Sequence, residues 1–241
     1  MQSLENKTVI VTGGSKGIGR VLALRLAGEK AKIVITGRNE KDLKDTEKEL
    51  AKICPDVLAV NADVSVHDDV QRTVEETVKR FNDIHFLINN AGMITHKSFN
   101  EFGIDEWKKV FEVNVFGTMM MCKESLPYME KLADTTGATI VNVSSMSGRQ
   151  GYERGTAYSA SKYALIGFAE SLFKEVRQKN IRVLTIFPSY VETSVKDEKD
   201  LKTIGKGVYM RAEDVADTII HTIKLPQRAM LKTIEVWGTN P

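Results

Sequence analysis

Short runs of apolar and β-branched residues recur along the chain, and longer segments with mixed polar and apolar positions separate them. Apolar runs of this length are typical of strands that are buried on both faces of a parallel sheet. Strands that alternate with helices favour an α/β architecture with helices on both faces. We therefore predict one domain over residues 1–241, built on a doubly wound parallel sheet of about seven strands near residues 8–13, 32–37, 57–62, 84–89, 138–144, 181–187 and 232–237.

Two predicted helices, over residues 105–131 and 156–179, carry more apolar residues than one stripe facing a sheet requires. Met119, Met120 and Met121 fall in the first of them. Consecutive residues point in different directions around a helix, so at least one of these side chains must lie away from the sheet. We therefore expect an additional apolar surface on these helices.

A glycine-rich turn directly follows the first predicted strand and reads Thr12-Gly13-Gly14-Ser15-Lys16-Gly17-Ile18-Gly19. Glycine lets the backbone bend sharply and approach a ligand closely. The helix predicted from Gly17 to Gly28 would point its free N–H groups at that ligand, which suits a pyrophosphate. The spacing is Gly-x-x-x-Gly-x-Gly, whereas the common dinucleotide fingerprint is Gly-x-Gly-x-x-Gly. The residues predicted to bind a dinucleotide here are Gly13, Ser15, Lys16, Gly17, Ile18 and Gly19.

Arg38 stands directly after the second predicted strand, residues 32–37. An NAD site usually has a carboxylate at this position, which holds the ribose 2′-hydroxyl. A guanidinium instead offers a planar, permanently charged fork that suits the 2′-phosphate of NADP, and Lys16 adds a second positive charge. Arg38 could also be an ordinary solvated charge, but its place at a strand end favours NADP(H) as the cofactor.

Tyr158 and Lys162 are separated by one helical turn, and Ser145 precedes them in the chain. Side chains at i and i+4 share one face of a helix, so the phenol and the ammonium would lie side by side. A phenol titrates near ~10, and an adjacent ammonium favours its ionised form, so we expect a lowered pKa that lets Tyr158 act as a general acid or base. Taken alone, residues 157–164 are more simply a helix start rich in small residues. The phosphate-binding turn and the other motifs change that balance.

Several of these motifs occur together, in order, along essentially the whole chain. They are Thr12-Gly13…Gly17-Ile18-Gly19, Asn89-Asn90-Ala91-Gly92, Asn114, Ser145, Tyr158 and Lys162. In this combination the chain resembles the short-chain dehydrogenase/reductase family. The resemblance implies a Rossmann fold, oxidoreductase activity and assembly into a homodimer or homotetramer, with the helices over residues 105–131 and 156–179 at the subunit interface.

The resemblance also implies a role for each catalytic candidate. Tyr158 would donate and accept the proton, and Lys162 would bind the nicotinamide ribose and tune Tyr158. Ser145 would hold the substrate oxygen, and Asn114 would support a water chain to Lys162.

Further residues are implied to bind the cofactor. Asp63 and Val64 would contact the adenine through side chain and backbone. The remaining positions implied to line the cofactor are Asn90, Ala91, Gly92, Pro188, Val191 and Thr193.

One position departs from the family pattern. After the sixth predicted strand the family usually has Pro-Gly, whereas this chain has Pro188-Ser189. If the position requires a positive φ, serine costs about 1 kcal/mol and tilts the nicotinamide pocket. The Val191 backbone and the Thr193 hydroxyl still stand where the carboxamide and the phosphates need them.

Composition and charge fit an enzyme better than a nucleic-acid-binding protein. The chain has 34 Lys and Arg against 32 Asp and Glu, a formal charge of +2, without a long basic stripe. Its two cysteines and four histidines lack metal-site spacing, so we expect no metal and a reducing compartment. The N-terminus has no apolar signal core and no run reaches membrane-spanning length, so we expect a cytoplasmic protein with no membrane partner.

Substrate choice is expected in three variable segments, residues 93–98, 146–156 and 190–210. Arg149, Tyr152 and Arg154 in the second could hold a polar or anionic substrate, or this loop could simply be solvated. The four histidines are expected at the surface or in packing, with His96 in the first segment as the one that could touch substrate. Residues 196–206 are charged and glycine-punctuated, which is typical of a mobile flap.

The sequence therefore predicts NADPH-dependent reduction of a small-molecule ketone or aldehyde to an alcohol, with Tyr158 as general acid. A 3-oxoacyl thioester (acyl-carrier-protein) reductase of fatty-acid synthesis is the alternative within reductases, followed by a sepiapterin-like carbonyl reductase. A non-catalytic NADP-sensing protein is the alternative outside enzymes. Such a protein would be expected to lose Ser145, Tyr158 or Lys162, and all three are present.

Overall fold

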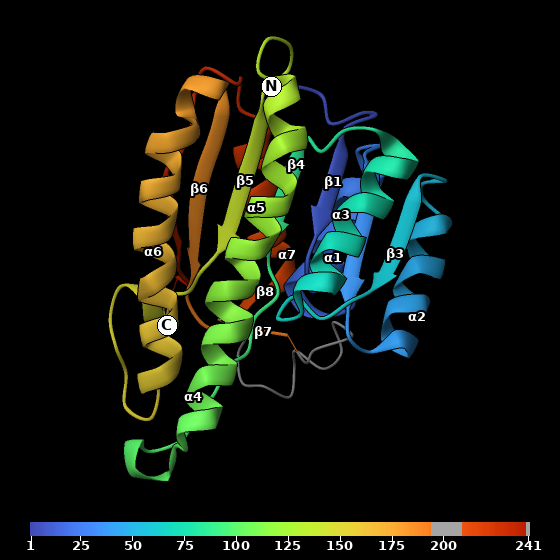
Figure 1. Cartoon of the computed structure of the whole chain (residues 1–241). Coiled ribbons are helices and arrows are strands. Elements are labelled where there is room, and N and C mark those ends of the chain that lie inside the picture. The colour runs from blue at the N-terminus through green and yellow to red at the C-terminus, as the bar shows by residue number, and fades with distance from the viewer. Residues whose placement is uncertain (194–208, 240–241) are drawn as a thin grey trace.

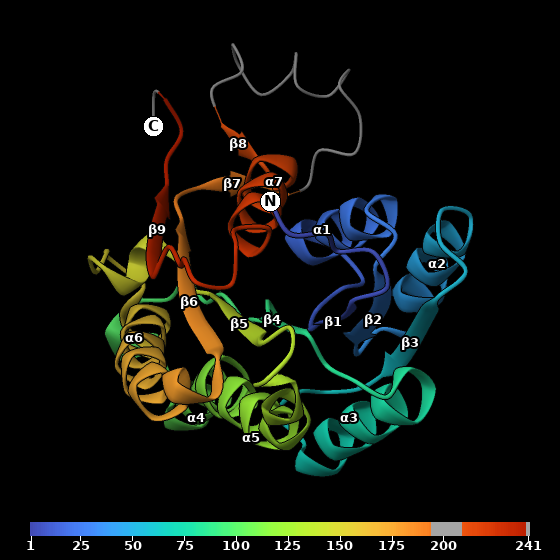
Figure 2. The same ribbon diagram turned by 90° about the horizontal axis from the view of Figure 1, so that it is seen from above.

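Seven parallel strands form the centre of the protein, in the order β3-β2-β1-β4-β5-β6-β9 (Figures 1 and 2). The computed structural model describes residues 1–193 and 209–239. The strands lie within about two residues of their predicted positions, which confirms the sheet. Their bounds are β1 (Thr8–Val11), β2 (Lys32–Gly37), β3 (Val57–Asn61), β4 (Phe86–Asn89), β5 (Ala138–Val143), β6 (Ile181–Pro188) and β9 (Thr233–Val236).

Helices cover both faces of this sheet, as Figure 2 shows. One face carries α1 (Gly17–Gly28), α2 (Glu40–Ala51) and α7 (Ala212–Ile223), and the other carries α3 (His67–Phe81), α5 (Gly117–Met129) and α6 (Thr156–Val176). Alternate residues of β1 enter different cores: Val9 and Val11 pack on the first side, whereas Ile10 packs on the second. Strands that are apolar on both faces therefore explain the uninterrupted apolar runs of the sequence.

The strand order reverses beside β1. The chain builds β1, β2 and β3 outward in one direction, and β4 then pairs with the other side of β1. Connections on the two sides of such a switch point diverge, so a crevice opens at the carboxyl ends of β1 and β4. The glycine-rich turn and the Asn89–Gly92 segment both emerge there.

The helix predicted over residues 105–131 is interrupted. It consists of α4 (Ile104–Phe111), a π-helical turn (Glu112–Phe116), α5 and a short 3-10 turn (Glu130–Leu132). A π turn inserts one extra residue and rotates the part of the helix beyond it, and such turns are frequent at functional sites. The second long helix is confirmed, because α6 continues into a 3-10 turn over Arg177–Lys179.

Met121 is buried and Met119 is 37% exposed, so the expectation that the three methionines do not share one face is confirmed. A second, two-stranded parallel sheet joins β7 (Val191–Glu192) to β8 (Met210–Arg211), and its strands are too short for a sequence pattern to reveal. The flap expected over residues 196–206 lies outside the described residues. Within residues 1–193 and 209–239, no helix is long and apolar enough to cross a membrane.

The turn between β1 and α1 depends on glycine at three positions. Gly13 and Gly17 have φ angles of 65° and 54°, in the left-handed region that side chains disfavour. At Gly19 the limit is space, because a Cβ atom would lie 2.3 Å from the Gly13 carbonyl oxygen and 2.4 Å from Nδ2 of Asn90. The chain can therefore pass between α1 and the end of β4 only without a side chain at residue 19.

This geometry predicts opposite outcomes for two Gly→Ala changes in the same helix. Gly19→Ala forces the turn to shift and should lower the free energy of unfolding by about 1–3 kcal/mol. Gly28→Ala at the other end of α1 meets nothing within 4 Å, and alanine's smaller entropy loss should leave stability unchanged or raise it by up to about 1 kcal/mol. Urea unfolding of both variants measures the difference, and equal stabilities would contradict the close approach at Gly19.

Candidate active site

A cavity of about 330 Å³ lies beyond the carboxyl ends of β1, β2, β3 and β4. Its position matches the crevice expected at the switch point of a doubly wound sheet. Most of the residues predicted to bind the cofactor line it. The lining residues are Gly13, Ser15, Lys16, Thr36, Gly37, Arg38, Asn39, Asp42, Ala62, Asp63, Val64, Asn90, Ala91, Gly92 and Val113.

Thr12 and Asn90 hold the floor of this cavity together. The Thr12 hydroxyl accepts hydrogen bonds from the backbone N–H groups of Asn90 and Ala91, both at 3.0 Å. In return, Nδ2 of Asn90 donates to the carbonyl oxygens of Thr12 at 2.9 Å and Gly13 at 3.2 Å. This pairing, which we call the Thr12–Asn90 clamp, joins the glycine-rich turn to the end of β4.

The other residues of the glycine-rich turn that were predicted to bind the cofactor lie around the start of α1. A Cβ atom on Gly17 would lie 3.7 Å from Cγ2 of Thr193, so the segment after β6 reaches the turn. Ser15 packs against Gly37, where a Cβ atom would meet its Oγ at 2.8 Å. Ile18 is partly buried against the core and anchors α1. Lys16 is exposed at the first position before α1.

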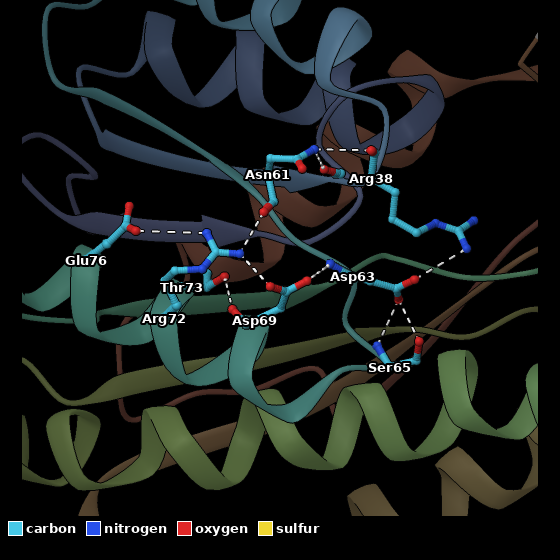
Figure 3. Close-up of polar contacts among 9 residues, drawn as sticks. Arg38, Asn61, Asp63, Ser65, Asp69, Arg72, Thr73 and Glu76 are labelled. Atoms are coloured by element: carbon cyan, nitrogen blue, oxygen red, sulfur yellow. Dashed lines mark hydrogen bonds and ion pairs between the residues drawn. The ribbon is translucent and has the colours of Figure 1, made fainter.

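The side of the cavity next to β2 and β3 is polar and well ordered by hydrogen bonds, as Figure 3 shows. Nδ2 of Asn61 donates to the carbonyl oxygens of Gly37 at 3.0 Å and Arg38 at 3.1 Å, which fixes the backbone that carries the guanidinium. Nη1 of Arg38 lies 3.6 Å from Oδ2 of Asp63. Arg38 and Asp63 therefore form an ion pair across the cavity wall.

Asp63 is itself positioned by the first turn of α3. Its backbone N–H donates to Oδ2 of Asp69 at 2.8 Å, and Arg72 bonds both Asp69 and the carbonyl oxygen of Asn61. Burial on its own raises the pKa of Asp63, but hydrogen bonds from Ser65 and the nearby Arg38 charge outweigh it. The net effect holds the pKa of Asp63 below its ordinary value, so this carboxylate is ionised at neutral pH.

The charged residues in the cavity lining balance one another. Lys16 and Arg38 supply two positive charges, and Asp42 and Asp63 supply two negative ones. Several features of this site were not predicted from the sequence. They are the cavity-lining Asp42 and the hydrogen bonds made by Thr12, Asn61, Asp69 and Arg72. Thr12 directly precedes the glycines, which is the one signal that could have pointed to it, whereas the others depend on contacts between separate elements.

Asn114 lies at the centre of the π turn and is fully buried. Its Oδ1 accepts from the backbone N–H of Met93 at 2.7 Å, and its Nδ2 donates to the Met93 carbonyl oxygen at 3.0 Å and to Oγ of Ser161 at 2.9 Å. A Cβ atom on Gly92 would lie 3.5 Å from Oδ1 of Asn114 and 3.7 Å from Nζ of Lys162. Gly92 lines the cavity and is also next to Asn114 and Lys162, so this end of the cavity lies beside the predicted catalytic residues.

Tyr158 and Lys162 lie in the first turns of α6 and point to the same side, as the i, i+4 spacing predicted. Nζ of Lys162 is 5.7 Å from the centroid of the Tyr158 ring and donates to the Val143 carbonyl oxygen at 2.9 Å. The Ser145 hydroxyl lies near enough to the Tyr158 phenol to lower its pKa, and it also accepts from the Ser147 N–H at 3.1 Å. The structure therefore brings together the three side chains that the sequence grouped.

The expected lowering of the Tyr158 pKa is wrong for the protein alone. Burial raises the pKa of Tyr158 to about 12, and the hydrogen bond from Ser145 only partly opposes this rise. Burial also lowers the pKa of Lys162 to about 8. Both groups are taken out of water together, and the desolvation of each outweighs the attraction between them. At neutral pH the phenol consequently holds its proton.

The condition under which Ser189 would be strained is not met. Ser189 is not among the described residues with positive φ, and its N–H donates to the Val236 carbonyl oxygen at 2.8 Å. Pro188 ends β6, and Val191 begins β7 and packs partly buried against the core. None of Pro188, Val191 and Thr193 lines the cavity, although Thr193 lies next to Gly17 at the start of α1.

A dinucleotide fits this site by the chemistry and spacing of its residues. Gly13, Gly17 and Gly19 leave the backbone bare where phosphates would approach, and the N–H groups that begin α1 point toward the same space. The cavity runs from the charged end at Arg38 to Gly92, beside Lys162. Among residues 1–193 and 209–239, no group of three His, Cys, Asp or Glu side chains is placed to hold a metal ion.

Comparisons with known proteins agree with this arrangement. An uncharacterized oxidoreductase of Staphylococcus epidermidis is 27% identical over 98% of this chain and 99% of its own length, and one of Staphylococcus saprophyticus is 30% identical over the same shares. The structure is similar to that of a levodione reductase, with a TM-score of 0.87, 24% identity and 98% of each chain covered. It is also similar to the 3-ketoacyl-(acyl-carrier-protein) reductase from Brucella melitensis complexed with NADH, with a TM-score of 0.86, 27% identity, and 97% and 98% coverage.

The sequence model of the short chain dehydrogenase family matches residues 7–203, which is most of the chain. The fold, the match to the family model and the similar oxidoreductases all identify the same family. This chain belongs to the short-chain dehydrogenase/reductase family and is an oxidoreductase of that type.

Proposed function

We propose that the protein reduces a ketone or aldehyde to an alcohol with NADPH, and that Tyr158 is the general acid. The observation that carries this proposal is the grouping of Ser145, Tyr158 and the buried Lys162 at the Gly92 end of the cavity, with Nζ of Lys162 5.7 Å from the centroid of the Tyr158 ring. Reduction of a carbonyl requires a proton donor at the oxygen. A phenol that keeps its proton at neutral pH supplies that donor.

Each residue then has a defined task. Bound NADPH supplies the hydride that the carbonyl carbon takes up. Ser145 donates a hydrogen bond that orients the substrate oxygen, and Tyr158 gives its proton to that oxygen. The phenolate left on Tyr158 is stabilised by Lys162, whose pKa of about 8 makes it able to return a proton. Asn114, fixed by Met93 and Ser161, keeps the π turn in place beside Lys162 and supports the water chain that would replenish it.

We assign the cofactor preference to the charged end of the cavity. Arg38 and Lys16 would bind a 2′-phosphate, and Asp63 and Val64 would contact an adenine ring. The Arg38–Asp63 ion pair holds the guanidinium at the cavity wall, so it is already oriented when the phosphate arrives. The negative charges of the phosphate would be met by Arg38 and Lys16, the two cations of the cavity lining.

Reduction of a 3-oxoacyl thioester is the second candidate. It is favoured by the similarity to the Brucella melitensis reductase, whose name states that substrate class. An acetoacetyl thioester should be reduced faster than simple ketones if this candidate is correct.

We further propose a cytoplasmic location and a homo-oligomer, dimer or tetramer.

The assembly is supported by exposed apolar side chains on α4, α5 and α6, which lie in one helical layer (Figure 2). Ile104, Phe116, Met119 and Tyr163 are all exposed there. A large set of exposed apolar side chains on adjacent helices is typical of a subunit interface.

Removing the Tyr158 hydroxyl should stop the chemistry and spare the cofactor. We expect Tyr158→Phe to lower kcat/KM by a factor of about 10²–10⁴, because the proton donor is lost, while NADPH binds as in the unmodified protein. NADPH oxidation and fluorescence titration measure the two effects. Tyr163→Phe on the same helix is the control, since its hydroxyl bonds the Arg149 carbonyl oxygen on the exposed surface. Near-normal turnover of Tyr158→Phe would refute the role.

Removing the Arg38 charge should change the cofactor preference. A charge-assisted hydrogen bond is worth about 1.5–3 kcal/mol, so Arg38→Leu should weaken NADPH binding about 10–100-fold and change NADH binding little. Arg177→Leu, an exposed arginine outside the cavity, is the control and should change neither. Dissociation constants from fluorescence titration provide the measurement. Tighter binding of NADH than NADPH by the unmodified protein would overturn the assignment.

We predict that the protein forms a particle of two or four chains whose mass does not change with protein concentration. Light scattering at micromolar concentration should give a multiple of the 26.9 kDa chain mass. Phe116→Glu puts a charge in the proposed interface and should shift the mass toward that of one chain. Ile53→Glu, which alters an exposed apolar residue after α2, should not. A single-chain mass for the unmodified protein would remove the prediction.

A further inference from the structure

Two loops over the candidate active site are joined to each other by aromatic and backbone contacts. The first follows β4 and contains His96, and the second follows β5 and contains Tyr152. Their rings stack with centroids 5.9 Å apart and planes inclined by 15°. Beside them, the Lys97 N–H donates to the Arg154 carbonyl oxygen at 3.0 Å.

Both halves of this stack are tied to the predicted catalytic residues. Tyr152 lies flat on Gly155, where a Cβ atom would meet its ring at 2.3 Å, and Gly155 is the residue directly before α6. The Gly155 carbonyl oxygen accepts from the Ser159 N–H at 2.7 Å in the turn that carries Tyr158. On the other loop, His96 follows Met93, whose backbone is held at both polar atoms by Asn114.

The stack presents ring surface to solvent close to the reacting group. Tyr152 is 38% exposed and His96 is exposed as well. Tyr152 is also close enough to Tyr158 for its charge to affect the pKa of that phenol. An aromatic surface next to a proton donor favours a flat ligand, since ring pairs gain from offset stacking.

The charged groups of the same loop offer less to an anionic ligand than the sequence indicated. Arg149 lies over the Phe187 ring, 4.2 Å from its centroid, and its Nε is 3.3 Å from Oε1 of Glu235. A guanidinium already matched by a carboxylate and a ring gains little from a second anion. Arg149 is therefore already paired and is not free to meet an anionic ligand.

We propose that Tyr152 and His96 form an aromatic wall that selects carbonyl substrates carrying a planar, uncharged aromatic ring, such as aryl ketones and aryl-fused cyclic ketones, over open-chain ketones. The inference rests on the proposed reductase function and names the substrate class of that site. Tyr152 and His96 act on substrate binding and hold the ring so that its carbonyl faces Tyr158.

The test compares ring and open-chain substrates with NADPH and the full chain. The substrates are acetophenone, indanone and diacetyl, and the variants are Tyr152→Ala, Tyr152→Phe and His96→Ala. For the ring substrates, Tyr152→Ala should raise KM about tenfold with little change in kcat, because stacking contributes to binding. Tyr152→Phe should keep the unmodified KM, and His96→Ala should fall between the two. Diacetyl kinetics should change less than about twofold throughout.

A binding measurement tests the aromatic wall of Tyr152 and His96 independently of catalysis. Naphthol has a planar ring and no carbonyl, so calorimetry should detect its binding to the unmodified protein and to Tyr152→Phe, and about tenfold weaker binding to Tyr152→Ala. His221→Ala, on the exposed surface of α7, is the control and should match the unmodified protein. Unchanged urea midpoints would establish that the variants are folded.

The outcomes separate the two proposals. If no carbonyl compound is reduced but naphthol binding depends on Tyr152, the reductase proposal fails and the aromatic wall stands. If Tyr152→Ala affects diacetyl as strongly as the ring substrates, or if the unmodified protein prefers diacetyl, the wall has no selective role and the inference is overturned. Equal naphthol binding by all variants would overturn it as well.

Discussion

The Thr12–Asn90 clamp is the interaction on which the rest of the site depends. Two strands of a parallel sheet end side by side at β1 and β4, and the loops after them would diverge without a tie between them. One threonine hydroxyl and one asparagine amide supply that tie with four hydrogen bonds. Because the clamp pulls the β4 end against the glycine-rich turn, Gly19 has no room for a side chain. The bare backbone that suits a pyrophosphate is therefore a consequence of how two strand ends are held together.

Desolvation decides the protonation state at the other end of the cavity. The sequence places a phenol beside an ammonium, and Coulomb attraction alone would stabilise the phenolate. In the folded chain both groups are buried, and burial penalises the charged form of each. The neutral phenol and the less basic amine that result suit a proton donor and the group that recharges it. Without bound cofactor, the protein is prepared to give a proton, which is the direction that carbonyl reduction requires.

Features carried by local patterns could be predicted from the sequence, and features carried by contacts between distant elements could not. The seven strands, α1 and the i, i+4 pairing of Tyr158 with Lys162 follow from periodicity and spacing. The π turn at Asn114 could not, because a helix with one extra residue has the same composition as a regular one. The Asn61 and Asp69 contacts that orient Arg38 and Asp63 join three separate elements, and no single segment records them. Whether Ser189 is strained depended on the sign of its φ angle, which the sequence does not state; in the structure φ is not positive and the Ser189 N–H bonds the Val236 carbonyl oxygen.

The two ends of the site differ in how they are built, and this difference bears on specificity. The cofactor end consists of strand termini and a helix start, so its geometry follows from the sheet and tolerates little change. The substrate end consists of two loops that meet through His96, Tyr152 and one backbone hydrogen bond. A change of one or two side chains there alters the surface presented to a substrate without disturbing the clamp or the glycine turn. Substrate choice can thus vary on this fold while the proposed nucleotide site stays where the sheet puts it.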